Sequence, residues 1–292
     1  IGGFCAPLGW YSLPGRAWFV DATATGEQSL DDAVYLEGDH NEAVGVGSVA
    51  LSETQVALSA GLSNWPGNTQ DPHVYIVNLP VTETGLASDV AVATLVGNGG
   101  NDGLVVTQAW DVNADGDRDL LTRARGYPDW DGSAFLFHGP LSGGYVYNDA
   151  DLRVHGENGT CELIVGFHAG QQGILSSGYC YGDRYSPGEY KGVVRYFEGQ
   201  PTGTVQTTDA NLSIVGSQEQ VKIGAHVAFY DWDGDGTEEI VAGSYDDVYV
   251  FETTLSGTVN EDAAAWVVEG VNTLQLEDGH LFLGDRASGE LV

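Results

Sequence analysis

The chain repeats itself at intervals of 54 to 60 residues. A run of four apolar and aromatic residues recurs at 17–20, 74–77, 134–137, 194–197 and 248–251. A glycine follows the end of four of these runs by six residues, at Gly26, Gly143, Gly203 and Gly257. An aspartate follows every run by eleven or twelve residues, at Asp32, Asp89, Asp149, Asp209 and Asp262. Features that stay in phase over five copies predict a fold built from one small unit used several times.

Short runs of Val, Ile, Leu, Tyr and Phe alternate with clusters of Gly, Asn, Asp, Ser and Pro, which is typical of an all-β protein. Each unit has room for four strands. In the fourth repeat we expect them at 162–168, 173–180, 192–199 and 211–216. A four-stranded antiparallel sheet cannot cover both of its own faces, whereas units packed around an axis bury both. The sequence therefore predicts a β-propeller with a repeat of ~58 residues.

Both ends of the chain fall inside a repeat. Residues 1–5 (IGGFC) match 176–180 (SSGYC), the end of a second strand. Residues 280–285 (HLFLGD) form another second strand, and 289–292 begin a third. We therefore expect one propeller domain over 1–292, with four complete blades and two partial ones, that is incomplete at both ends. The absence of methionine fits a processed or excised piece.

Charge excludes several classes of partner. The chain has 10 Lys and Arg against 42 Asp and Glu, so its formal net charge is −32. A nucleic-acid binder needs the opposite sign, and so does a protein that docks on anionic lipid. No apolar run approaches the ~18 residues of a membrane span, and no signal peptide is visible. Hydrophobic residues make up 42% of the chain, which argues against disorder.

Two loops carry the clearest chemistry. Segments 111–119 (DVNADGDRD) and 231–239 (DWDGDGTEE) place oxygen side chains at positions 1, 3, 5 and 9 and glycine at position 6. Alternate residues of a tight loop can converge on one point, and Ca²⁺ takes six to eight oxygen ligands. Oxygen ligands without Cys or His argue against zinc or copper, and Mg²⁺ gives up its water less readily. We expect two structural Ca²⁺ sites, and the alternative is a solvated acidic turn.

An EF-hand begins in the same way but is excluded here. Its twelfth position is a bidentate Glu, and that position is Thr122 or Ala242 in this chain. Short apolar runs follow both loops, at 120–121 and 240–241. The two segments are therefore predicted to connect the first and second strands of their repeats.

The order of a D-x-[DN]-x-D-G-x-x-[DE] loop, an apolar strand and a Tyr/Phe-rich strand followed by glycine resembles the FG-GAP repeat, the blade of integrin α-subunit-like β-propellers. The segment 135–143 (FLFHGPLSG) is similar to the third strand of bacterial members. The resemblance covers essentially the whole chain. It implies a ring of about seven blades, Ca²⁺ in the first inter-strand loops, and an extracellular role in adhesion or ligand binding.

Carried over to this sequence, the resemblance implies two sets of calcium ligands. They are Asp111, Asn113, Asp115, Asp117 through its carbonyl, and Asp119, then Asp231, Asp233, Asp235, Thr237 through its carbonyl, and Glu239. The corresponding loops at 50–55, 168–173 and 276–279 lack four spaced oxygen side chains. Only two of the five visible loops are therefore expected to hold metal.

The three cysteines suggest an oxidising compartment. A hairpin that turns at 169–172 in an unbulged ladder would set Cys161 opposite Cys180, close enough for a disulfide after a small adjustment. Two buried free thiols are the alternative. By the match of SSGYC, Cys5 occupies the position of Cys180 in its own blade, and we expect it to have no partner within these residues.

The sequence favours a non-enzymatic role. It contains no nucleophile elbow and no phosphate-binding glycine loop. The first hypothesis is a secreted or cell-surface calcium-binding module for a protein or glycan ligand, with Trp130 and Trp232 available to stack on the ligand or to pack between blades. The second is a self-assembling subunit of an extracellular filament, sheath or surface layer. The third is the non-catalytic propeller of a larger secreted hydrolase or lyase.

Overall fold

The computed structural model describes residues 2–4, 15–20, 23, 25, 27, 29–39, 42–60, 71–98, 103–124, 131–157, 164–178, 191–218, 221–271, 273–277, 280–285 and 290–291. Within them the protein is all-β, with 26 strands, one short α-helix and four 3₁₀ turns. The chain divides into two compact units, which are described separately. Unit 1 comprises Ile1–Ala124 with Phe135–Asp151, and unit 2 comprises Arg125–Ala134 with Leu152–Val292.

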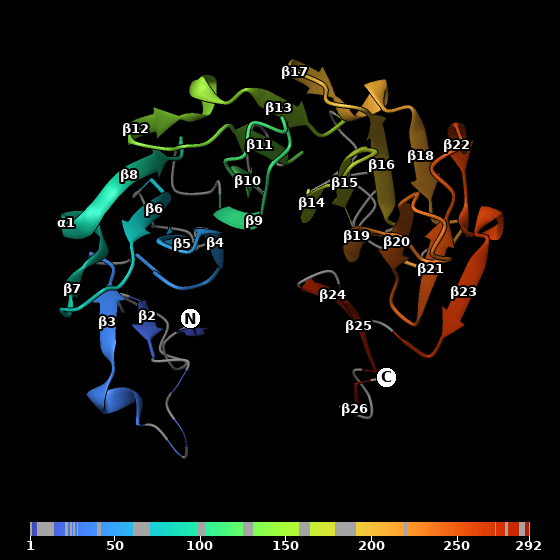
Figure 1. The fold of residues 1–292 in the computed structure, drawn as a ribbon. Helices are drawn as coiled ribbons and strands as arrows, with labels where there is room; N and C mark the ends of the chain where they lie inside the picture. The colour runs from blue at the N-terminus through green and yellow to red at the C-terminus, as the bar shows by residue number, and fades with distance from the viewer. Residues whose placement is uncertain are drawn as a thin grey trace. The chain divides into compact units, whose positions relative to one another are not determined.

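Unit 1 contains two whole sheets (Figure 1). The first has the order β1 (Gly2–Phe4), β2 (Arg16–Phe19), β3 (Val34–Glu37) and β7 (Gly85–Leu86). The second has the order β4 (Ser48–Ser52), β5 (Gln55–Ala60), β6 (His73–Asn78), β8 (Ala91–Val96) and β12 (Gly143–Val146). A third sheet contributes strands to both units and has the order β9 (Leu104–Trp110), β10 (Asp119–Ala124), β11 (Ser133–Phe137), β13 (Leu152–His155) and β17 (Gly203–Gln206).

Unit 2 contains three further sheets. The first has the order β14 (Gly166–Ala169), β15 (Gly173–Gly178), β16 (Val193–Glu198), β18 (Leu212–Val215) and β22 (Gly257–Val259). The second has the order β19 (His226–Tyr230), β20 (Glu239–Gly243), β21 (Asp247–Phe251) and β23 (Trp266–Glu269). The third has the order β24 (Thr273–Glu277), β25 (His280–Asp285) and β26 (Glu290–Leu291).

Four strands follow one another in antiparallel order in the repeats that begin at β4, β14 and β19, as the sequence predicts. In the fourth repeat, strands β15, β16 and β18 lie inside the ranges expected for them, and β14 begins later than expected and ends one residue beyond its range, at Ala169. The partial repeats also match. Strand β1 pairs with β2 at the start of the chain, and β25 follows β24 near its end. No helix among the described residues is long and apolar enough to cross a membrane.

A fifth strand, which the sequence did not predict, completes several sheets. Strand β12 pairs in parallel with β8, β17 with β13, β22 with β18, and the short β7 with β3. Each fifth strand comes from the repeat that follows, and Figure 1 shows β22 alongside β18. The expectation of purely antiparallel blades is therefore wrong, because these sheets each have one parallel outer pair of strands.

The repeated aspartate belongs to a short helical turn, which in four of the five repeats follows the fifth strand. It lies in α1 (Ala87–Val90) or in one of the turns η1 (Leu30–Asp32), η2 (Tyr147–Asp149), η3 (Thr207–Asp209) and η4 (Glu261–Ala263). In two of these turns its carboxylate accepts the backbone N–H three residues earlier. Asp149 accepts from Val146 and Asp209 from Gln206, both at 2.9 Å. Its recurrence thus reflects local capping of the turn.

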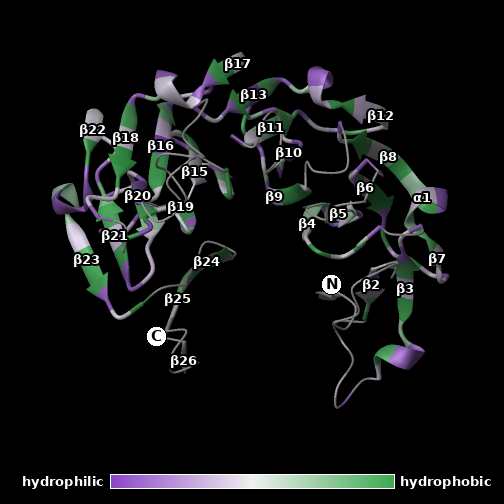
Figure 2. Ribbon diagram, turned by 180° about the vertical axis from the view of Figure 1, so that it is seen from behind, coloured by the Kyte–Doolittle hydropathy of each residue, from purple (hydrophilic) through white to green (hydrophobic). Residues whose placement is uncertain are grey.

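Sheets within unit 2 pack face to face and bury both sides of β20. Ile240 and Ala242 of β20 contact a cluster that includes Leu175 and Tyr196 from the sheet before. Val241, on the opposite face, contacts Val271 and Leu274 towards the sheet after. Figure 2 shows the strands mainly hydrophobic and the 3₁₀ turns mainly hydrophilic. Burial on both faces explains why β20 reads as a continuous apolar run.

The hairpin of β14 and β15 has a different register from the one expected. Phe167 faces Ser176, and Ala169 faces Ile174. The turn is closed by the N–H of Gly170, which donates to the carbonyl of Gly173 at 3.0 Å. This register is offset by two residues from one that would set Cys161 opposite Cys180, because the turn centre lies one residue later. Both cysteines and Cys5 lie outside the described residues, so the disulfide stays a prediction.

Candidate metal loops

The two acidic segments connect the first and second strands of their sheets, as predicted. Loop 1, residues 111–119, joins β9 to β10 in unit 1. Loop 2, residues 231–239, joins β19 to β20 in unit 2. Each loop leads into a strand rather than a helix, which confirms that neither is an EF-hand.

Backbone hydrogen bonds hold the two loops in the same way. The carboxylate at position 1 accepts the N–H of the glycine at position 6, at 3.0 Å in both loops. The oxygen at position 3 accepts the N–H of position 5, at 3.0 Å for Asn113 and 3.1 Å for Asp233. The carboxylate at position 5 accepts the N–H of position 7, at 2.9 Å for Asp115 and 2.7 Å for Asp235. Alternate side chains are therefore directed towards the inside of each loop.

Two positions in each loop adopt left-handed backbone. Position 6 has φ of 96° at Gly116 and 91° at Gly236, which accounts for glycine there. Position 4 has φ of 58° at Ala114 and 80° at Gly234. Loop 1 thus places a side chain where the backbone favours glycine. The sequence pattern identified position 6 but not position 4.

The carboxylate at position 9 is buried at the start of the second strand. It holds the loop by accepting hydrogen bonds from backbone N–H groups. Asp119 is fully buried, and its Oδ2 accepts the Val112 N–H at 2.8 Å while its Oδ1 accepts the Gly139 N–H at 2.9 Å. The Nδ1 atom of His138 lies 3.2 Å from the same Oδ1. Glu239 is equally buried and accepts the Trp232 N–H at 2.7 Å.

Loop 2 gathers three carboxylates at one point. One oxygen each of Asp231, Asp233 and Glu239 lies within 4.8 Å of the others, and among the described residues this is the one such group of three acidic, His or Cys side chains. Loop 1 has Asn113 where loop 2 has Asp233, so its corresponding set is two carboxylates and an amide. Asp235, Thr237, Asp115 and Asp117 lie in the loops as predicted but outside that group.

The electrostatics of the two loops differ accordingly. Burial raises the pKa of Glu239, and the negative charges of Asp233, Glu252 and Asp235 raise it further, against the opposing hydrogen bond from Trp232. In loop 1, hydrogen bonds from the Asp117 N–H and the Asn113 amide hold the pKa of Asp115 below its ordinary value. At Glu239, the raising effects of burial and of the neighbouring carboxylates on the pKa thus exceed the lowering effect of the hydrogen bond from Trp232.

The side chain at position 8 ties each loop to the neighbouring sheet of its own unit, a link that the sequence did not reveal. Arg118 donates to the carbonyl of Ala50 at 3.2 Å. Glu238 accepts the N–H of Gln171 at 2.6 Å, where Gly170 leaves room for its carboxylate. Residues 50 and 171 both lie beside the first inter-strand turn of the preceding sheet. The loops therefore brace two adjacent sheets as well as two strands.

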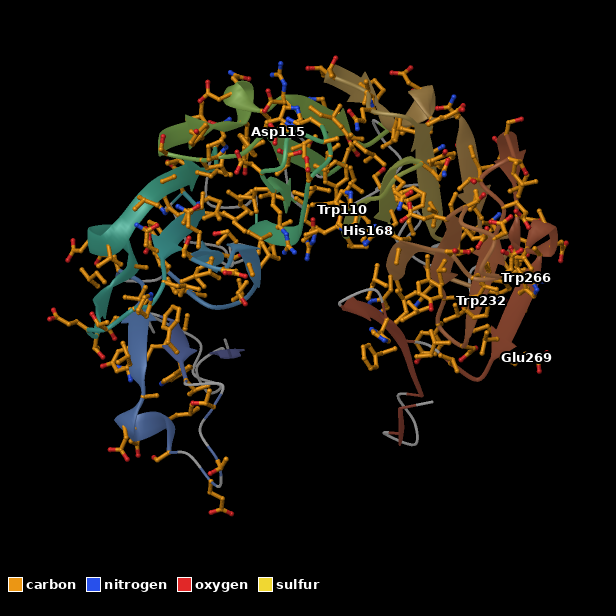
Figure 3. All side chains as sticks on the ribbon, in the orientation of Figure 1. Trp110, Asp115, His168, Trp232, Trp266 and Glu269 are labelled. Atoms are coloured by element: carbon orange, nitrogen blue, oxygen red, sulfur yellow. The ribbon has the colours of Figure 1, made fainter. Side chains whose placement is uncertain are left out.

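The tryptophans proposed for ligand stacking fall in different places. Trp232 is half-buried, meets Tyr230 edge-on with ring centroids 6.5 Å apart, and packs against the cluster that contains Val241 and Leu274 (Figure 3). This contact favours the packing role over the stacking role. Trp130 lies outside the described residues.

A comparison with protein-family models found no match, and a comparison with the curated proteins found none.

Proposed function

We propose that the chain is a calcium-stabilised β-propeller that acts outside the cell as a binding or adhesion module. Support for the propeller comes from the recurrence of one strand order in successive sheets and from the burial of both faces of the sheet that contains β20. A sheet covered on both sides by its neighbours is the arrangement that a propeller requires. The resemblance to FG-GAP repeats points to the same fold.

The observation that carries the calcium proposal is the convergence of Asp231, Asp233 and Glu239. Three carboxylates at this separation repel one another, and a divalent cation between them removes the repulsion. Both oxygens of Asp231 accept a backbone N–H, but each carboxylate oxygen has a second lone pair left for a cation. Asp235, the carbonyl of Thr237 and water would complete a set of hard oxygen ligands suited to Ca²⁺.

The cation has a structural role in this proposal. Loop 2 joins β19 to β20, and Glu238 joins the loop to the turn beside Gln171. Fixing the loop therefore supports the packing of two sheets. The ligand of the module would be a protein or a glycan, and the strong negative charge of the chain favours partners that are basic or bound through the divalent cation.

Thermal unfolding with and without calcium tests the proposal. We expect a chelator to lower the melting temperature and Ca²⁺ to restore it. When the calcium concentration exceeds its Kd a hundredfold, the free energy of unfolding should rise by roughly 3 kcal/mol. The double variant Asp231→Asn/Asp233→Asn should lose most of this response. Asp246→Asn, which removes an exposed acid outside the loops of unit 2, should keep it.

Two results would contradict the proposal. The first is a melting temperature that does not respond to calcium. The second is an equal response in the wild type and the double variant, which would place the calcium effect elsewhere. Magnesium at the same concentration serves as the control for general screening, because the loop should favour the larger ion.

A further inference from the structure

The chain has only two lysines, and the fold brings them onto adjacent segments of unit 2. Lys191 lies just before β16, and Lys222 lies in the connection between β18 and β19. The two segments meet at a backbone bridge between Gly192 and Ile223, and the Ile223 N–H donates to the carbonyl of Lys191 at 3.1 Å. In a chain with a net charge of −32, two neighbouring lysines give an anion a place with less repulsion than the acidic loops offer.

Hydrogen bonds on both sides hold Lys222 in a backbone conformation that lysine rarely adopts. Its φ is 47°, in the left-handed region. On one side the carbonyl of Val221 accepts the Tyr245 N–H at 3.1 Å, and on the other side the Ile223 N–H is bonded to Lys191. Strain of this kind persists only where the surrounding structure fixes it. The backbone of Lys222 is thus fixed by its neighbours.

The corresponding segment of unit 1 has no such strain. Val44 corresponds to Ile223, because both are fully buried and both are closely approached by the glycine that leads into the third strand of their sheet. Ala43 therefore corresponds to Lys222, and its backbone is not left-handed. The fold of this connection requires neither the left-handed conformation nor a lysine. A strained residue that the fold does not require points to a role in binding.

An exposed aromatic ring lies beside Lys222. Tyr245 is 58% exposed, and the Nζ atom of Lys222 lies over its ring, 5.4 Å from the centroid. The ring is carried by a tight turn between β20 and β21. In this turn the Ser244 hydroxyl donates to the carbonyl of Asp247 at 2.8 Å and accepts its N–H at 2.9 Å. A large aromatic side chain held in the open on a rigid turn is typical of a contact surface.

Two aspartates follow Tyr245 in the chain and differ in their contacts. The carboxylate of Asp247 accepts the Gly270 N–H at 3.1 Å and the hydroxyl of Tyr249 at 3.3 Å. Asp246 is exposed in the same turn as Tyr245. Its charge repels an anion at this surface, whereas its oxygens would accept hydrogen bonds from an uncharged sugar. The effect of removing Asp246 therefore distinguishes the two kinds of ligand.

We propose that Lys191, Lys222 and Tyr245 bind a glycan that contains uronic acid. The pyranose ring would lie on the exposed part of Tyr245, and the sugar carboxylate would pair with the lysine ammonium groups. An uncharged sugar would use the ring without the lysines, and a small inorganic anion would use the lysines without the ring. This inference names the ligand class of the binding module and rests on that part of the proposed function.

Titration calorimetry at low ionic strength tests the proposal. The probes are trigalacturonate and a hyaluronan tetrasaccharide, and cellotriose is the uncharged control. We expect at least one of the two uronates to bind, and cellotriose to bind about tenfold more weakly or not at all. The affinity for the uronate should fall as salt is added, because the lysines and the carboxylate are screened from each other.

Two pairs of variants separate binding from folding. Lys222→Asn removes the charge but tolerates left-handed backbone, so it should weaken binding about tenfold without lowering the melting temperature. Lys222→Arg keeps the charge and should bind more tightly than Lys222→Asn. Tyr245→Ala removes the ring and should also weaken binding, whereas Tyr245→Phe keeps the ring and should bind as the wild type does. Because one pair changes residue 222 and the other residue 245, a folding defect in one pair leaves the other informative.

Asp246→Asn gives a result of opposite sign, since it should strengthen the binding of the uronate at low salt. The proposal is overturned if neither uronate binds, if Lys222→Asn binds as tightly as the wild type, or if Asp246→Asn weakens binding, which would indicate an uncharged sugar. The calcium proposal is tested separately by melting. A chain that binds uronate through Lys222 but does not respond to calcium would keep this inference and contradict the calcium site, and the reverse result would do the opposite.

Discussion

Loop 1 and loop 2 share their length and their left-handed positions, but they differ in charge at positions 3, 7 and 8 and at one residue beside each loop. At position 7 the pair is Asp117 and Thr237, and at position 8 it is Arg118 and Glu238. Loop 1 has Asn113 where loop 2 has Asp233. The residue after the third strand is His138 beside loop 1, at 3.2 Å from Asp119, and Glu252 in the corresponding place near loop 2. The conformation of such a loop is thus set by glycine and by hydrogen bonds to the backbone. How strongly a bound cation stabilises the loop is set separately, by charged side chains that are not needed for the loop conformation.

The strongest test of this difference exchanges the buried carboxylate in each loop for its amide. Asp119→Asn removes an anion that accepts two N–H groups and faces His138, so it should cost about 3 kcal/mol of stability even in chelator. Glu239→Gln in chelator should cost little or even stabilise, because it relieves repulsion by Asp233 and Glu252. Denaturant unfolding with and without calcium measures both. Equal losses in chelator would show that the loops have the same need for a cation.

Acid should affect unit 2 more than unit 1 through His168. Burial lowers the pKa of His168 to about 4, and its Nδ1 is inaccessible to solvent although the ring edge is partly exposed. The unfolded chain binds the proton near pH 6.5 and the folded chain only near 4, so the free energy of unfolding falls as pH drops through this window, by about 3 kcal/mol. Val49 holds the corresponding place in unit 1. His168→Val should flatten this part of the stability curve.

The carboxylates elsewhere in the chain also titrate in acid, so the measurement is the difference between variants. Stability of wild type and His168→Val is compared from pH 7 to pH 4 by denaturant unfolding. His280→Gln, at an exposed histidine, is the matched control and should follow the wild type. Parallel curves for wild type and His168→Val would contradict the assignment.

The residues that follow the third strands, His138 and Glu252, can be exchanged between the two sites. The exchange should make loop 2 depend less on calcium and loop 1 depend more on it. Glu252→His, beside loop 2, replaces a repelling charge and should stabilise the calcium-free protein by about 1 kcal/mol. His138→Glu, beside loop 1, should destabilise the calcium-free protein by a similar amount and increase the response to calcium. Titration calorimetry with Ca²⁺ and unfolding in chelator check both. Effects of the same sign in the two loops would refute the comparison.

The smallest effect concerns position 4. Ala114 has φ of 58°, so Ala114→Gly should relieve backbone strain. After subtraction of the extra conformational entropy that glycine loses on folding, the protein should be more stable by about 0.5 kcal/mol. Gly234→Ala should destabilise by about 1 kcal/mol through backbone strain alone, because an added Cβ would meet nothing within 4 Å. Chemical unfolding of the two variants resolves the signs. A stabilising Gly234→Ala would mean that the two turns are not equivalent.

The strand order and the place of both loops could be predicted because they rest on periodic patterns. The apolar runs fix the third strands, and the Asp-Gly spacing fixes the loops. The fifth strands were missed because segments such as 203–206 (GTVQ) are short and half polar, and their pairing lies with a strand some 50 residues earlier in the chain. The recurrent glycine ahead of each turn was the signal that could have revealed them.

Finer features depend on contacts that no local pattern encodes. The register of β14 and β15 follows from a turn closed between Gly170 and Gly173, while the sequence also allows a turn centred one residue earlier. Arg118 and Glu238 occupy the same loop position, but Arg118 donates a hydrogen bond to the neighbouring sheet and Glu238 accepts one. Because the two residues differ in type, the sequence pattern does not reveal this shared contact. The different cation demand of the two loops depends on His138 and Glu252, which lie some 13 to 19 residues beyond their loops.

The borrowed fifth strand has a consequence for how the chain bears tension. Among the described residues, four repeats place a few residues in parallel register on the sheet before them, as β22 does on β18 and β12 on β8. A force that pulls one repeat away along the strand direction loads all the hydrogen bonds of that ladder at once, in shear, whereas a simple hairpin would peel open one bond at a time. The parallel ladder therefore joins neighbouring repeats by several hydrogen bonds at once. This joint should resist stretching better than the connecting turns alone would.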